Sequence, residues 1–183
     1  NSNFYPGVKE VPKLGDNSAW KFTTIRQCNY FINLIRERIE NKEITGTEKE
    51  INHYLGEVYF FRAYDYYRLL TNYGDVPIID KVVEDKNIKP SRNTTAQCYK
   101  AITDDLTDAV KLLRPVKKEG KINKWGAMTL LSRVYLYMGN DKEAYDVAAE
   151  AIKGAEKQGY KLWTNDEYAK IWATPFNSEL LFE

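Results

Sequence analysis

The sequence predicts an all-α fold of antiparallel helix hairpins of the tetratricopeptide-like type, with short extended segments near 76–79 and 178–183. Three observations support this prediction. Apolar side chains recur at steps of three and four residues, which is the period of an amphipathic helix. Residues that start helices precede these runs, and glycines follow them. Small side chains also recur on two successive predicted helices, so that a pair of helices can approach closely.

The first predicted helix follows Ser18 as its N-cap and runs for about 20 residues. Its apolar stripe consists of Ile25, Cys28, Ile32, Ile35 and Ile39. The second helix opens on a capping box, Thr47 with Glu50, and runs to about residue 72. Its expected apolar face includes Ile51, Tyr54, Leu55, Val58, Phe61, Tyr66 and Leu69. Gly74 ends this helix, and Pro77 forces the residue before it into an extended conformation.

Four more helices are predicted in the second half of the chain. The third begins at Thr94 or Thr95 and ends at Pro115. The fourth follows Asn123 and the fifth follows Asp141 as N-caps, and a short sixth covers residues 165–172. The inward positions expected on the fifth are Ala144, Ala148, Ala151, Ile152 and Ala155.

The fourth and fifth predicted helices form a tetratricopeptide-like hairpin. Ser132, Ala144 and Ala151 are small enough for the two helices to approach, and Tyr135 fills the wider gap. A weaker copy of the pattern lies earlier, interrupted by the excursion 74–93. Two such units are fewer than the roughly three that a repeat array needs.

Both ends of the chain also look cut. It lacks an initiator Met, and its last residues, 178–183, stop within an apolar stretch. We therefore expect the helical domain at 18–183 to be part of a larger protein. Pro6, Gly7, Pro12 and Gly15 break regular structure and predict an irregular N-terminal segment at 1–17.

Composition and rare residues exclude several classes of function. The 27 Lys and Arg against 26 Asp and Glu argue against a nucleic-acid binder, and no apolar run reaches the length of a membrane span. Cys28 and Cys98 lie 70 residues apart, as two reduced thiols or one long-range disulfide. His53 is the single histidine and has no nucleophile motif beside it. We predict no metal site and no cofactor.

Glycoside cleavage is also excluded by the carboxylates. A glycosidase needs two carboxylates that flank one cleft at a set separation. Asp104 and Asp105 are neighbours on a predicted helix and point apart, and Glu48 and Glu50 lie in a capping turn. We therefore predict that this chain is not an enzyme and has no catalytic residues.

The strongest motif is the end of the second helix with the turn that follows it. Residues 57–70 read EVYFFRAYDYYRLL, and residues 72–77 read NYGDVP. Three further segments agree in order: the helix led by Trp20, the helix over 99–113, and the hairpin over 124–140. Together with the last residues, 178–183, these segments resemble the SusD/RagB family, the surface glycan-binding lipoproteins of Bacteroidetes-type outer membranes.

The resemblance implies a function in polysaccharide utilization. Family members bind carbohydrates such as starch, are surface-exposed at the cell outer membrane, and carry a lipid on an N-terminal Cys that this chain lacks. They sit on a SusC-like TonB-dependent transporter, toward which the helical repeats face. Oligo- or polysaccharide is bound mostly by parts outside this chain. The resemblance therefore implies a non-catalytic glycan- or nutrient-binding component whose helical scaffold is seen here.

Two questions stay open at this point. The resemblance makes Asn3, Phe4 and Tyr5 the candidate ligand-binding residues, and the alternative is that they belong to a packing or unstructured tail. The alternative function is a tetratricopeptide-like adaptor that binds a peptide in its groove. Adaptors of that kind keep regular 34-residue repeats, whereas the excursion 74–93 splits the first hairpin.

Arg62 is expected to pair with a carboxylate such as Asp105.

Overall fold

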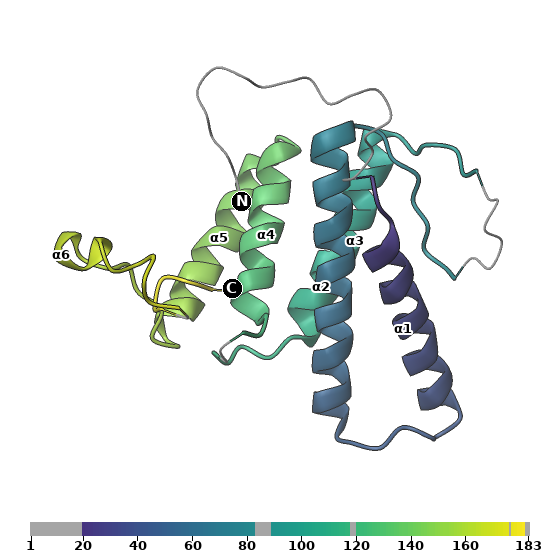
Figure 1. The fold of residues 1–183 in the computed structure, drawn as a ribbon, viewed down its shortest axis with the longest axis horizontal. Helices are drawn as coiled ribbons and strands as arrows, with labels where there is room; N and C mark the ends of the chain where they lie inside the picture. The colour runs from purple at the N-terminus through teal and green to yellow at the C-terminus, as the bar shows by residue number, and fades with distance from the viewer. Residues whose placement is uncertain (1–19, 83–88, 118–119, 176, 182–183) are drawn as a thin grey trace.

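The computed structural model describes residues 20–82, 89–117, 120–175 and 177–181. Within these ranges the chain is helical and contains no strand, as predicted. The helices are α1 (Thr23–Glu40), α2 (Glu48–Tyr73), α3 (Thr95–Leu112), α4 (Lys124–Tyr137), α5 (Asp141–Glu156) and α6 (Asn165–Tyr168). The first five pack in chain order, each against the next, and α6 is set off from them beside α5 (Figure 1).

The predicted capping signals are confirmed at α2 and α4. The Thr47 hydroxyl accepts a hydrogen bond from the Glu50 N–H (3.3 Å), and the Glu50 carboxylate accepts one from the Thr47 N–H (3.0 Å). The Asn123 side chain accepts from the N–H groups of Trp125 and Gly126. Each bond satisfies a backbone donor that the first helical turn leaves free.

Two helix starts differ from the prediction. α1 begins at Thr23 with Phe22 as N-cap, later than expected, and Ser18 lies outside the described residues. Trp20 packs edge-to-face on both Phe22 and Tyr73, which holds residues 20–22 out of the helix. Asn140, and not Asp141, is the N-cap of α5.

The C-terminal elements are shorter than predicted. α6 ends at Tyr168 and continues as turns, because it buries no side chain that would stabilise another helical turn. Of the second expected extended segment, 178–183, the described residues 178–181 begin with a turn rather than a strand. The Asn177 side chain accepts from the Glu179 N–H (2.9 Å) and so favours this turn.

The core lies along the seams of the first four helices. Its largest fully buried side chains are Tyr66, Ile25, Leu69, Ile102, Leu106, Ile122, Val76 and Val134. Cys28 and Cys98 are both free and buried, so the two thiols are not joined in a disulfide. Ile39, Tyr54, Phe61 and Ile152 were expected on inward faces but are 37–61% exposed. No helix of the described ranges is long and apolar enough to cross a membrane.

The α4–α5 hairpin has the predicted small-residue seam. Ala144 and Ala151 are buried, and the Ser132 hydroxyl donates to the Ala144 carbonyl across the seam (2.8 Å). The fit is tight at Gly154, where an added Cβ would clash with the Trp125 ring. Trp125 is therefore an aromatic residue of this seam, and Gly154 makes room for it.

Gly154→Ala is expected to lower the free energy of unfolding by about 1–3 kcal/mol, because the indole must move away from the new methyl group. In a Trp125→Ala background the same change should instead stabilise α5 by about 0.5–1 kcal/mol through helix propensity. Urea unfolding measures both effects, with the exposed Lys153→Ala as a near-neutral control. An equal effect of Gly154→Ala in both backgrounds would contradict this account of the seam.

Candidate functional site

A polar cluster lies inside the helical core. Arg62 on α2 donates to both carboxylate oxygens of Asp105 on α3, from Nε to Oδ2 (2.7 Å) and from Nη2 to Oδ1 (2.6 Å). This is the ion pair that the sequence predicted. The third contact goes to α1, where the Asn29 side-chain oxygen accepts from Arg62 Nη1 (2.7 Å). One guanidinium therefore joins three helices.

The same cluster holds the extended segment after α2. The Asn29 amide donates to the carbonyls of Ile79 (2.7 Å) and Lys81 (3.3 Å). The Tyr66 hydroxyl accepts from the Ile79 N–H (2.7 Å) and contacts the Ile79 carbonyl oxygen as a donor (3.0 Å). On the other side of this segment, the Asn93 side chain accepts from the Ile78 N–H (2.8 Å). The start of the excursion 74–93 is thus anchored to α1 and α2, and Asn93 at its end is bonded back to that start.

Burial controls the electrostatics of this cluster. The side chains of Arg62 and Asp105 are only 12% and 10% exposed. Burial raises the pKa of Asp105, against the opposing effect of the Arg62 charge. Burial lowers the pKa of Arg62, but its bonds to Asp105 outweigh that effect and leave it raised. The pair is a structural ion pair, because each partner's hydrogen-bonding groups face the other.

The candidate catalytic groups are engaged in structural contacts. Asp105 pairs with Arg62, and its neighbour Asp104 makes an exposed ion pair with Lys100 (2.6 Å). Glu50 belongs to the cap of α2. His53 accepts from the Arg114 N–H through Nδ1 (3.4 Å). In the described ranges, His, Cys, Asp and Glu form no group of three or more that could hold a metal ion.

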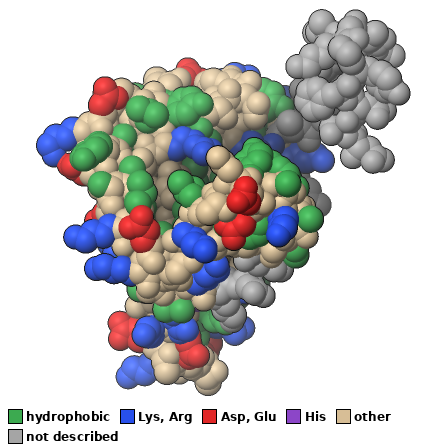
Figure 2. Space-filling view, turned by 90° about the vertical axis from the view of Figure 1, so that its left-hand side faces the viewer, with side chains coloured by type: hydrophobic (Ala, Val, Ile, Leu, Met, Phe, Trp, Pro, Cys, Tyr) green, Lys and Arg blue, Asp and Glu red, His purple; other side chains and the backbone are tan. Residues whose placement is uncertain are grey.

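Two hollows mark the surface of the described helices. A groove of about 390 Å³ runs along the outer side of the α4–α5 hairpin, between Ala148, Ile152, Leu162 and Leu181. Figure 2 looks onto this side of the molecule, where apolar side chains border a hollow. A second pocket, of about 340 Å³, lies where α2 begins and α3 ends. Neither hollow was predicted from the sequence.

The ligand-binding residues predicted from the sequence, Asn3, Phe4 and Tyr5, lie outside the described residues. The structure therefore does not place them relative to either hollow. A signal for the groove was present in the small and apolar residues of α5, which were assigned to the inner face alone. The pocket had a weaker signal, the basic residues at the end of α3.

Comparison with known proteins identifies the family. The family model described as "Starch-binding associating with outer membrane" matches residues 15–136. This chain belongs to the SusD-like family. That family is described by what it binds and not by a reaction, in agreement with the prediction that the chain is not an enzyme.

Three similar proteins show how much of the chain is matched. A putative sugar-binding protein from Bacteroides vulgatus is 34% identical, with a TM-score of 0.80 over 92% of this chain and 41% of that one. A laminarin-binding SusD-like protein is 26% identical, with a TM-score of 0.76 over 86% and 34%. SusD-like protein P2 of Formosa agariphila is 27% identical over 153 residues, 81% of this chain and 30% of that protein. The chain therefore spans less than half the length of these SusD-like relatives.

Arg62→Met is expected to lower the free energy of unfolding by about 3–5 kcal/mol, because it leaves the Asp105 carboxylate buried without its charge partner. The double variant Arg62→Met/Asp105→Leu removes both charges and should cost less than Arg62→Met alone. Lys100→Met, which breaks the exposed pair with Asp104, is the matched control. It should lower the free energy of unfolding by less than about 1 kcal/mol. Equal losses for Arg62→Met and Lys100→Met in urea unfolding would refute this role.

Burial raises the pKa of the Cys28 thiol from 9.0 to about 11. The unfolded chain therefore loses this proton at a lower pH than the folded chain, and the stability that Cys28 contributes is lost as the pH rises from 9 to 11. Cys28→Ala should make the fall in unfolding free energy across this range shallower. Urea unfolding at a series of alkaline pH values measures the slope, and an unchanged slope would exclude a buried, protonated Cys28.

Proposed function

We propose that this chain is the helical part of a non-catalytic glycan-binding component of a surface polysaccharide uptake system. Membership of a family described as starch-binding supports this proposal, as do relatives described as sugar-binding and laminarin-binding. The single observation that carries it is the match over residues 15–136, which includes the polar cluster and the excursion 74–93. The location that goes with it is the outer membrane, surface-exposed, with a lipid anchor in the full-length protein.

The proposal divides the work between scaffold and loops. The helical domain at 18–183 acts as a rigid frame that docks a SusC-like TonB-dependent transporter. Glycan is bound by segments that lie mostly outside this chain, with Asn3, Phe4 and Tyr5 of the segment 1–17 at the edge of that site. Sugars stack their C–H faces on aromatic rings and need a few placed polar partners, which these three side chains offer.

The alternative, a tetratricopeptide-like adaptor, has less support. α4 and α5 form a regular hairpin, but α2 and α3 are separated by the excursion 74–93, which the polar cluster anchors. An adaptor repeat would not need such an insertion. The excursion fits a protein that uses its helices to carry loops.

A binding screen tests the proposal. The full-length protein and this chain alone are each titrated with a panel of polysaccharides that includes starch and laminarin. Isothermal titration calorimetry measures the binding. We expect the full-length protein to bind at least one of them and this chain to bind none measurably. Tight and specific binding by this chain alone would contradict the assignment of the glycan site to segments outside it. Absence of binding by the full-length protein would contradict the glycan-binding function itself.

The transporter partner needs its own measurement. Full-length protein and a SusC-like TonB-dependent transporter of the same organism, purified together from outer membranes, should elute as one complex. Elution of the two as separate species, with glycan binding intact, would leave the glycan function in place and refute the docking role.

A further inference from the structure

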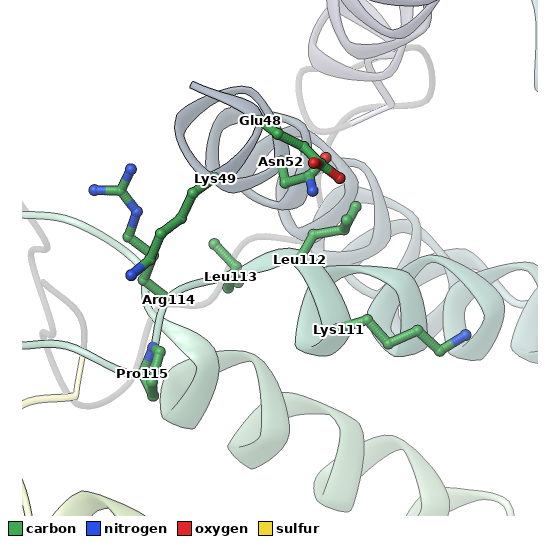
Figure 3. Close-up of a pocket in the computed structure, with 8 residues that line it drawn as sticks. All are labelled: Glu48, Lys49, Asn52, Lys111, Leu112, Leu113, Arg114 and Pro115. Carbon is green, nitrogen blue, oxygen red and sulfur yellow. The ribbon is translucent and has the colours of Figure 1, made fainter. Parts of the chain in front are cut away.

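The pocket between the start of α2 and the end of α3 carries an excess of positive charge (Figure 3). Lys49, Lys111 and Arg114 line it together with one carboxylate, Glu48, for a formal net charge of +2. Figure 3 shows the Lys49 side chain running toward Arg114, whereas the Glu48 carboxylate lies on the opposite side. Lys111 has a surface partner in Asp108 (3.4 Å). The charge is therefore concentrated at Lys49 and Arg114.

The backbone around Arg114 is held in place. Its N–H donates to His53 Nδ1 on α2 (3.4 Å), and its carbonyl accepts from the Lys124 N–H (3.1 Å). Leu113 beside it is buried and packs so closely on α2 that a Cβ added at Gly56 would lie 3.0 Å from Leu113 Cγ. The pocket wall is thus part of the packed core and does not need to form when a ligand arrives.

Arg114 has a buried donor without a partner. Its Nε is out of contact with solvent, and within the described residues it makes no hydrogen bond. The nearby Glu50 carboxylate is already bonded to the N–H (3.0 Å) and the hydroxyl (2.7 Å) of Thr47. Buried donors are nearly always paired in native proteins, because an unpaired one loses its hydration without compensation. Arg114 lines the pocket and is only half-buried as a residue, so its guanidinium can turn to offer this donor to an anion there.

We propose that this pocket binds a side-chain carboxylate from an acidic segment of a partner protein. Arg and carboxylate form charge-assisted, often bidentate hydrogen bonds, and Lys49 adds a second cation on the same side. Leu112, Leu113 and Pro115 offer aliphatic surface to the neighbouring residues of such a segment. The described lining contains no aromatic ring on which a sugar could stack, which favours a peptide over an acidic glycan. The proposal does not depend on the transporter partner proposed above.

Peptide titration tests the pocket directly. This chain is titrated with a fluorescent capped peptide, Asp-Leu-Glu-Leu-Asp, and with its amide counterpart, Asn-Leu-Gln-Leu-Asn, while anisotropy is recorded. A glucuronic acid disaccharide and inorganic sulfate serve as competing probes. We expect binding of the acidic peptide that weakens with salt, and little binding of the amide peptide.

Variants assign the binding to this pocket. Arg114→Gln should lower the affinity for the acidic peptide about tenfold or more, which corresponds to the loss of one charged hydrogen bond. Lys49→Gln should lower this affinity by a smaller factor. Glu48→Gln should raise the affinity, because the substitution removes the carboxylate that lines the pocket. Lys157→Gln, at the exposed residue directly after α5, is the matched control and should change nothing. If Arg114→Gln does not fold, the opposite shifts of Lys49→Gln and Glu48→Gln decide the outcome.

Four results would overturn the proposal. They are the absence of binding by any probe, equal binding of the acidic and amide peptides, tighter binding of the glucuronic acid disaccharide or of sulfate than of the acidic peptide, and equal effects of Glu48→Gln and Lys157→Gln.

Discussion

The fork of hydrogen bonds from Arg62 is the interaction on which the rest of this structure depends. A guanidinium that is only 12% exposed must find acceptors inside the protein, and here it finds them on two other helices, at Asp105 and Asn29. Because Arg presents its donors in a rigid planar arrangement, these bonds set the relative positions of α1, α2 and α3. The Asn29 amide in turn donates to the Ile79 carbonyl, so the position of α1 also determines where the excursion 74–93 begins. The first residues of the excursion are thus bonded to the helices at defined positions.

Much of this arrangement could be predicted from the sequence, because local signals and global packing agree. The capping box at Thr47, the small-residue seam of α4 and α5 and the Arg62–Asp105 pair follow from residue type and spacing. α2 was harder, since its aromatic side chains surround the helix: Tyr59 and Phe60 are buried while Tyr54 and Phe61 are exposed. A periodic pattern that covers every face cannot indicate which face is inside. The anchoring of Ile79 was also out of reach, because residues 50 positions apart make that contact.

The candidate sites divide in the same way. The α4–α5 groove and the pocket at Arg114 are each completed by residues far apart in the sequence, so local patterns indicate some of their lining residues but not the hollows themselves. The groove also explains the outward Ile152: α5 packs one face on α4 and leaves a second apolar face along the groove. In a stack of helix pairs, each pair buries surface against both of its neighbours. One helix of a pair is therefore expected to have two apolar faces, one toward its own partner helix and one toward the next element. The ligand residues Asn3, Phe4 and Tyr5 remain a prediction from family resemblance.

The most direct measurement of the central claim is native-state hydrogen exchange at the Ile79 amide, which donates to the Tyr66 hydroxyl. If the polar cluster locks the excursion to the helices, this amide should exchange only through global unfolding. Its exchange free energy should then equal that of core amides of α3 such as Leu106 and fall with denaturant at the same slope. Fast exchange of Ile79 with no dependence on denaturant would mean that the segment opens locally, and the frame described here would not be rigid.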